Sequence, residues 1–482
     1  MNDGVTDAPT FAVVGKINMG KSSVLSTLLE IDDDTLIRVS ATPGETTRCY
    51  ALPLTFDDRE MIRFVDTPGF SRAMEAMRAI QDRHGPGTPD LKTIKHFVTE
   101  QLEKGEFEDE ARLLQPVIEG AGVLYVIDPS KPLRDAFVAE MEILRWTGTP
   151  RMAVLNEKAA NANAERTGEW RKRLGSYFNL VRTFNAHHAR FSERRSLLKS
   201  LLEIDETNKS RIEETIRLID REWEQRREES AEVIMDFLAK ALRHRESEKI
   251  DEKEEELEHR KERAKEKLKK KYYAKIATFE EQTYAKLLKL YRHKLLKVEV
   301  VQGKFHGVDL SSKETWQKWG LSRSQLAIAG GLAGGAAGVA IDIGSAGLTH
   351  GFGTLVGVLT GAGGAFFKGD SLPELKISAQ GVTFNGDRRK ALIMGPPQSD
   401  NFAWILLDRV LHHYQEIVTR SHGRRDEDVI AGEGSGWVRR FGRDRRTRIQ
   451  KWILNQLKGA ERSFDPEVFR ELVLILEEVE GG

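Results

Sequence analysis

The chain has 482 residues, of which 39% are hydrophobic, and its 75 Lys and Arg residues balance 75 Asp and Glu residues. The length predicts about three domains with packed cores, and the charge balance argues against a protein whose whole surface binds nucleic acid. Cys49 is the only cysteine, which excludes an intramolecular disulfide and a cysteine-based zinc site. Residues 1–10 are polar and acidic and do not resemble a secretory signal, so we expect a cytoplasmic location.

The first predicted element is a short strand followed by a phosphate-binding loop. Residues 15–23 read GKINMGKSS and follow the apolar run 11–14. The spacing G-x-x-x-x-G-K-S between a strand and a helix lets successive backbone N–H groups surround a polyphosphate. Lys21 would bridge the β- and γ-phosphates, and the Ser22 hydroxyl would bind Mg²⁺. The residues that we assign to nucleotide binding here are Gly15, Gly20, Lys21, Ser22 and Ser23.

A second motif, Asp66-Thr67-Pro68-Gly69, ends the next apolar strand at residues 61–65. A carboxylate at this place can hold Mg²⁺ through water, and Gly69 leaves its N–H group available to a γ-phosphate. The polar segment 42–48 lies between the two motifs. We expect Thr47 to close over the metal when the third phosphate is present, with Thr46 as the alternative. A purely structural interpretation stays open as well, in which the threonine lies in a turn and caps its own backbone.

With these motifs, residues 11–190 resemble the Era, EngA and MnmE group of bacterial GTPases, whose phosphate loops read G-x-x-N-x-G-K-S-[ST] and whose switch reads T-T-R. The resemblance implies Mg²⁺-dependent hydrolysis of GTP to GDP, with Lys21, Thr47 and Gly69 in catalytic roles. Asn18 matches an asparagine that helps to bind K⁺ in this group. Phe70 stands where Ras-like proteins keep a catalytic glutamine, so the resemblance implies slow turnover, aided by K⁺, a partner or a second copy in a homodimer.

The base-reading motif departs from this group. The resemblance implies N-K-x-D after residues 151–155, but Asn156 is followed by Glu, Lys and then Ala159 in place of the aspartate that selects guanine. Losing one side of a paired hydrogen-bonding site weakens selectivity, so strict preference for GTP over ATP is in doubt. Farther on, residues 185–187 are similar to an S-A-K loop in which Ala186 would offer its backbone N–H group to the guanine oxygen. We therefore still expect GTP.

Strand-like and helical stretches alternate through the first part of the chain, which predicts an α/β P-loop GTPase domain with a doubly wound, mainly parallel sheet at residues 1–205. Residues 71–120 form an insertion that either relays the nucleotide state or decorates the surface. Long charged helices are expected at residues 206–300. The highly charged stretch 245–271 suits an extended helix or antiparallel coiled coil, with a single solvated helix as the alternative.

A glycine-rich apolar helical hairpin is predicted at residues 301–370. Between residues 326 and 367 the chain is almost free of charge, and glycines recur at every fourth position in two stretches. Such helices approach closely and need packing or lipid to be stable. Two interpretations stay open, a hairpin that inserts into lipid at the inner membrane face and a tightly packed hairpin inside a helical domain.

Residues 371–482 are expected to form a small α+β and helical C-terminal part, with paired strands at 375–384 and 390–394. A cluster of arginines at 439–448 suits the phosphates of RNA or of lipid headgroups, or is a solvated loop. From the whole sequence we expect a GTP-hydrolysing switch that acts at the membrane. The alternatives are an Era-like GTPase associated with RNA or the ribosome and a nucleotide-binding scaffold with negligible turnover.

Overall fold

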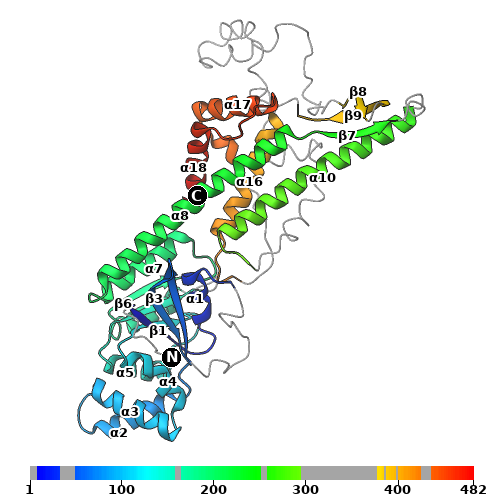
Figure 1. The fold of residues 1–482 in the computed structure, drawn as a ribbon. Coiled ribbons are helices and arrows are strands. Elements are labelled where there is room, and N and C mark those ends of the chain that lie inside the picture. The colour runs from blue at the N-terminus through cyan, green and yellow to red at the C-terminus, as the bar shows by residue number, and fades with distance from the viewer. Residues whose placement is uncertain are drawn as a thin grey trace. The chain divides into compact units, whose positions relative to one another are not determined.

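The computed structural model describes residues 8–32, 49–157, 164–250, 258–294, 377–384, 387–397, 400–424 and 436–481. The expectations for Thr46, Thr47, Ala159 and the hairpin at 326–367 lie outside these residues. The chain divides into two units (Figure 1). The first consists of Met1–Gln225, Arg292–Leu295 and Val418–Asp426, and the second of Arg226–Tyr291, Leu296–Ile417 and Glu427–Gly482.

A six-stranded sheet forms the centre of the first unit, in the order β2-β3-β1-β4-β5-β6. Its strands are β1 (Thr10–Val14), β2 (Tyr50–Phe56), β3 (Arg59–Asp66), β4 (Gly122–Ile127), β5 (Arg151–Asn156) and β6 (Leu180–Phe184). All neighbours run parallel except β2 and β3. The central strands β1, β4 and β5 are almost wholly buried, as a parallel sheet covered on both faces requires. The predicted doubly wound, mainly parallel sheet is confirmed.

Helices cover both faces of this sheet (Figure 1). They are α1 (Lys21–Leu29), α2 (Ala73–His84), α3 (Leu91–Lys104), α4 (Glu108–Ile118), α5 (Asp135–Trp146), α6 (Ala164–Leu174) and α7 (Phe191–Ile204). Successive residues of β1 alternate between two apolar clusters, so that Phe11 packs with α1 and α7 and Ala12 packs with helices α2 to α6. The insertion at 71–120 forms α2, α3 and α4, and Ile80, Phe97 and Leu113 belong to the core. The insertion is therefore more than a surface decoration.

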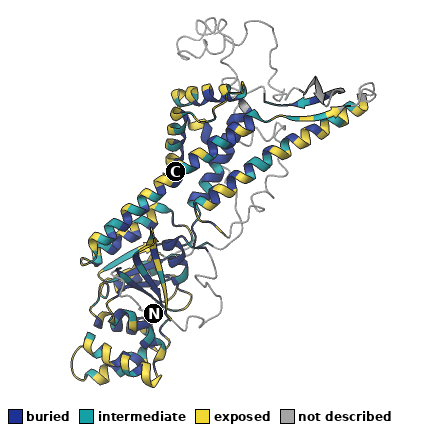
Figure 2. Cartoon of the chain, in the orientation of Figure 1, coloured by how far each residue is buried: buried dark blue, intermediate teal, exposed yellow. Residues whose placement is uncertain are grey.

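Long helices dominate the second unit, as expected from the sequence. They are α8 (Lys209–Arg243), which contributes residues to both units, α10 (Glu258–Leu290), α16 (Asn401–Thr419), α17 (Arg443–Leu457) and α18 (Pro466–Gly481), with a short 3₁₀ helix η1 (Trp437–Arg440). Buried side chains form a stripe along α8, whereas α16 is buried on nearly all sides (Figure 2). In the described ranges, no helix is both long and apolar enough to cross a bilayer.

A three-stranded antiparallel sheet joins β7 (Glu246–Ile250), β9 (Asp387–Met394) and β8 (Ile377–Phe384), in that order. The predicted pairing of the last two strands is confirmed, with Phe384 opposite Asp387. The helix expected from residue 245 is wrong at its start, because 246–250 form a strand and α10 begins only at Glu258. Glu248 in this strand pairs with Lys267 and Lys271 of α10, so its charges are satisfied across elements rather than along one helix.

Candidate nucleotide-binding site

The phosphate loop connects β1 to α1 through two glycines that no other residue could replace without strain. Gly15 has φ 152°, and a Cβ atom there would collide with the backbone carbonyl oxygen of Val126 on β4. Gly20 caps α1 in the left-handed region, with φ 92°. Both positions favour glycine because only glycine adopts such φ values without a steric cost. The structure thus gives the predicted motif the strand, loop and helix that phosphate binding requires.

Lys21 and Asp66 are buried at this loop. The Lys21 ammonium donates to the Gly15 carbonyl oxygen at 2.9 Å, and burial lowers the pKa of Lys21, opposed by the charges of Asp66 and Glu140. Burial raises the pKa of Asp66 to about 6, opposed by Lys21. One Asp66 carboxylate oxygen, Oδ1, has no hydrogen-bond partner among the described residues.

These groups fit a divalent cation. Asp66 ends β3 opposite Val13 of β1, two residues before the phosphate loop begins at Gly15, and Ser22 stands in the first turn of α1. A buried carboxylate oxygen without a partner, together with a hydroxyl, is the hard oxygen donor set that Mg²⁺ takes beside phosphates. The sequence assigned both residues to the metal, and the fold brings them to one edge of the sheet.

The segment that follows Asp66 lies directly against the phosphate loop. Thr67 donates its hydroxyl proton to the Val13 carbonyl oxygen at 2.9 Å. A Cβ atom at Gly69 would lie 3.3 Å from the Gly15 carbonyl oxygen and 3.5 Å from the Ile17 nitrogen. The Gly69 backbone therefore lies against the phosphate loop. Phe70 is buried in the apolar core, so its side chain takes no part in orienting water.

Asn156 connects this loop to the base-reading loop. Its amide nitrogen donates to the Met19 carbonyl oxygen at 3.2 Å, and its Oδ1 accepts from the backbone N–H group of Ala186 at 3.1 Å. Both residues were predicted from the sequence, but the bridge between them was not. The Ala186 N–H group that the sequence assigned to the guanine oxygen is thus donated to Asn156 in this structure.

Comparison with known proteins agrees with this geometry. Residues 10–157 match a family described as 50S ribosome-binding GTPase, and residues 171–469, more than half of the chain, match a domain of unknown function, DUF3482. A probable GTP-binding protein EngB of Gemmatimonas aurantiaca is 30% identical over 184 residues, covering 37% of this chain and 75% of that protein. The chain belongs to the EngB-like P-loop GTPases. Its C-terminal part is a DUF3482 domain.

Other similarities to this EngB-like GTPase are more partial. A probable GTP-binding protein EngB of Desulfosudis oleivorans is 37% identical over 81 residues, which is 17% of this chain and 38% of that protein. The chain therefore spans well under half of that relative. The crystal structure of a bacterial selenocysteine-specific elongation factor, EF-Sec, aligns with 42% of this chain and 29% of that one, at 16% identity and a TM-score of 0.25.

A buried cluster behind the phosphate loop escaped the sequence analysis. The Tyr125 hydroxyl donates to Glu140 at 2.7 Å, and the Lys16 ammonium lies 3.4 Å from the other Glu140 oxygen. Burial raises the pKa of Glu140 to about 7, opposed chiefly by Lys16. The available signal was a glutamate on the apolar face of α5, three residues after Phe137 and one turn before Leu144.

Helix α4 of the insertion is hydrogen-bonded to Ser71 and Arg72, which lie shortly after Gly69. Glu110 of α4 is buried, and its Oε1 accepts from the backbone N–H group of Ser71 at 2.9 Å and from that of Arg72. The Ser71 hydroxyl donates to Asp109 at 2.6 Å. A carboxylate in this place satisfies N–H groups at the start of α2 that have no partner within the helix. These contacts tie α4 to the first residues of the insertion, which begin two positions after Gly69.

The basic surfaces of the second unit are largely paired internally. Arg445 binds Glu478 in bidentate fashion at 2.8 and 2.9 Å and also contacts Glu471. Arg448 binds Glu471 as well, and Arg446 donates to backbone carbonyls. Part of the arginine cluster predicted to meet phosphates is therefore used to hold α17 against α18.

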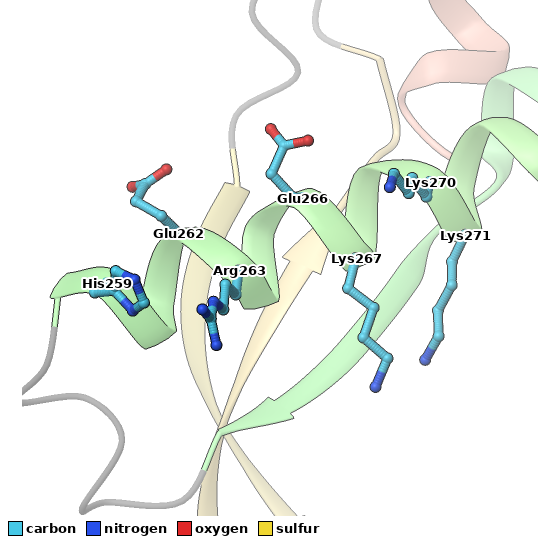
Figure 3. A pocket seen from close by; sticks show the side chains of 7 residues that line it. All are labelled: His259, Glu262, Arg263, Glu266, Lys267, Lys270 and Lys271. Atoms are coloured by element: carbon cyan, nitrogen blue, oxygen red, sulfur yellow. The ribbon is translucent and has the colours of Figure 1, made fainter.

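A hollow along α10 is lined by charged side chains from this helix (Figure 3). Its lining residues are His259, Glu262, Arg263, Glu266, Lys267, Lys270 and Lys271. In Figure 3 the two glutamates point to one side of the helix, and Lys267 and Lys271 point to the other. Both of these lysines bind Glu248 of β7. These side chains diverge and pair elsewhere, so the hollow has no convergent set of groups for a ligand.

Proposed function

We propose that the first unit binds GTP with Mg²⁺, hydrolyses it to GDP and phosphate, and acts as a nucleotide switch. The observation that carries this proposal is the meeting of Lys21, Asp66 and Gly69 at one loop, where a buried Asp66 oxygen has no hydrogen-bond partner among the residues that the structure describes. Lys21 would neutralise phosphate charge, and the Gly69 N–H group would bind the terminal phosphate. Mg²⁺ held by Ser22, Asp66 and Thr47 would supply charge stabilisation at the phosphates.

Turnover is expected to be slow because no side chain at position 70 orients the attacking water. Phe70 is buried among apolar residues, so transition-state charge would be met by Lys21 and the bound cations. The Asn18 side chain is our candidate for a K⁺ site, and Asn18 stands in the loop with φ 65°. A second copy of the chain that contributes a cation is the other route to faster hydrolysis.

The switch would act through the insertion and through the long C-terminal region. Closure of Gly69 on a γ-phosphate would pull on Ser71, which is bound to Glu110 of α4. For the output we keep the expectation of a membrane surface, based on the nearly uncharged stretch 326–367. Flotation of the full chain with liposomes, compared with a variant lacking residues 326–367 and run with GTP analogue, GDP or no nucleotide, tests this step. Flotation that is absent, or that survives the deletion, contradicts it.

Ribosome association is the second candidate function. It is supported by the match to a family described as 50S ribosome-binding GTPase and by the exposed residues Arg439, Arg440 and Arg443. Binding to ribosomal subunits that weakens steeply with salt would favour it, because phosphate contacts release counterions. A scaffold that binds nucleotide without turnover is the third candidate, and phosphate-release kinetics separate it from the first. Saturable GTP binding with no phosphate release above background would favour the scaffold.

A further inference from the structure

Two short segments far along the chain pack against α1 in the first unit. Residues 292–294 follow α10, and residues 421–424 follow α16. The Lys294 backbone N–H group donates to Asp32 at 2.8 Å, just beyond α1. The rings of His293 and His422 stack with centroids 4.3 Å apart and planes at 11°. The two segments thus hold one another at the end of the helix that begins with Lys21.

The second of these segments reaches the base-reading loop. The Ser421 hydroxyl donates to the Ala186 carbonyl oxygen, and the Gly423 backbone N–H group donates to the Ser421 hydroxyl at 3.2 Å. Thr27 of α1 lies within hydrogen-bond distance of the same carbonyl, at 3.0 Å. A serine hydroxyl has one proton and two lone pairs, so Ser421 can donate to Ala186 while it accepts from Gly423. All four residues are buried.

Gly423 makes this approach possible. A Cβ atom at this position would lie 2.8 Å from the Thr27 hydroxyl and 2.9 Å from the Ser23 carbonyl oxygen, and closer still to the Ala186 carbonyl oxygen. Two of these three atoms belong to backbone, which yields only if the chain shifts. Position 423 therefore accepts no side chain unless the phosphate-loop helix or the base-reading loop moves.

The peptide groups of Ala186 are consequently held from two sides. Asn156 accepts from its N–H group on the side of the phosphate loop, and Ser421 binds its carbonyl oxygen from the segment after α16. In this chain Ala159 replaces the aspartate expected for guanine recognition, so base selection depends more heavily on the Ala186 loop. We propose that Ser421 and Gly423 are positioning residues of the base-reading loop, which makes a segment of the C-terminal region a determinant of nucleotide selectivity.

This inference rests on the proposed function, because it assumes that the Ala186 N–H group reads the oxygen at position 6 of the purine. GTP and ITP carry that oxygen, whereas ATP carries an amino group there. Loosening the loop should weaken GTP and ITP equally and leave ATP unaffected. A general loss of stability, or damage to the phosphate loop, would instead weaken all three nucleotides.

The test compares wild type, Ser421→Ala and Gly423→Ala in the full chain, with dissociation constants for GTP, ITP and ATP from competition against a fluorescent nucleotide. Ser200→Ala is the matched control, since Ser200 is a buried serine of α7 that hydrogen-bonds to Arg182 and Ser196. We expect GTP and ITP to bind about three- to tenfold more weakly in both variants, the size of one lost hydrogen bond, with ATP unchanged. The control should match wild type.

Equal weakening of all three nucleotides, or no change in selectivity in both variants, would overturn the inference while leaving the proposed function intact. If the wild-type chain binds none of the three, the proposed function itself fails, and this inference fails with it. Because Ser421→Ala removes only a hydroxyl group and Gly423→Ala adds only a methyl group, the two variants disturb the loop in opposite ways.

Discussion

Ser71 donates its backbone N–H group to the buried Glu110 carboxylate at 2.9 Å, which joins α4 to the first residues of the insertion, two positions after Gly69. This contact links a segment expected to respond to the γ-phosphate with α4 of the insertion. Since the same carboxylate oxygen also accepts from Arg72, its removal would leave two N–H groups at the start of α2 without a partner.

Glu110→Ala should therefore lower the free energy of unfolding by about 1–2 kcal/mol, the usual cost of losing a helix N-cap. It should also slow GTP turnover, because the segment after Gly69 would no longer be held in one position. Urea denaturation and phosphate-release assays measure the two effects, and Glu103→Ala at an exposed position of α3 is the control. A variant as stable and as active as wild type would show that the contact is dispensable.

Lys21→Ala should abolish nucleotide binding without lowering thermal stability. Burial already disfavours the charged ammonium group, as its lowered pKa shows, so its loss removes a phosphate ligand and leaves the core unchanged. Nucleotide titration and thermal unfolding are the measurements, with Lys92→Ala on the exposed face of α3 as the control. Retained binding in a normally folded Lys21→Ala protein would remove the site assignment.

Hydrolysis should be faster in potassium than in sodium at matched ionic strength. Phe70 supplies no polar group, so a monovalent cation beside the phosphates would replace part of the missing charge stabilisation. Asn18→Ala should erase the difference between the two salts while nucleotide binding persists. Steady-state rates of phosphate release in the two salts test this prediction. Equal rates for the wild-type chain would contradict a K⁺ site at the phosphates.

Restoring the missing carboxylate should sharpen base selection. Ala159→Asp is expected to raise the preference for GTP over ATP by about tenfold or more, because a paired hydrogen-bonding site rejects a mismatched base strongly. Competition binding with both nucleotides measures the ratio. If the wild-type chain already excludes ATP as strongly as the variant, another residue reads the base and the alignment of this loop with N-K-x-D is wrong.

Glu140 gives a pH-dependent prediction. Its pKa is about 7 in the folded chain, against about 4.3 in an unfolded chain. The folded state therefore holds more protons between these values, and Glu140 lowers the free energy of unfolding progressively as pH rises through that window, by up to about 4 kcal/mol.

The Glu140→Gln variant has no ionisable group at this position, so it lacks this pH-dependent loss of stability. It also loses the ionic contact with Lys16. The stability of the variant relative to wild type should therefore increase between pH 5 and pH 8. Tyr125 and Lys21 also face this carboxylate, and they are unchanged in both proteins. Urea denaturation at the two pH values measures the difference, and a difference that is constant or that falls with pH would contradict the raised pKa.

The parts of the fold that sequence reasoning could predict are those encoded locally. The phosphate loop and Asp66 can be recognised in the sequence because their chemistry needs fixed residue types at fixed spacing. The fold brings the two close together. The strand at 246–250 was missed because its residues, ESEKI, show no apolar alternation. Its pairing with β9 comes from residues more than 100 positions away, which a local pattern does not reveal.

The contacts that tie the site to the rest of the chain were equally hidden. Nothing in the local sequence marks Glu110 as a cap for Ser71 or Ser421 as a partner of Ala186, since each pair joins segments that only the tertiary fold makes neighbours. In a sequence, an isolated polar residue is ordinarily interpreted as a surface position. The burial of Glu110 and Ser421 is visible only in the folded structure. Glu140 was the partial exception, because it interrupts an apolar helix face.

The first unit includes residues 418–426, and this has a consequence for how the protein is made. A ribosome synthesising the chain delivers the phosphate loop first and the contact from Ser421 to Ala186 almost at the end. During the intervening synthesis, at about 5–20 residues per second, the back of the base-reading loop lacks the segment that covers it. A chain cut short before residue 421 would carry the phosphate loop, Asp66 and the base-reading loop and still lack the segment that completes the unit.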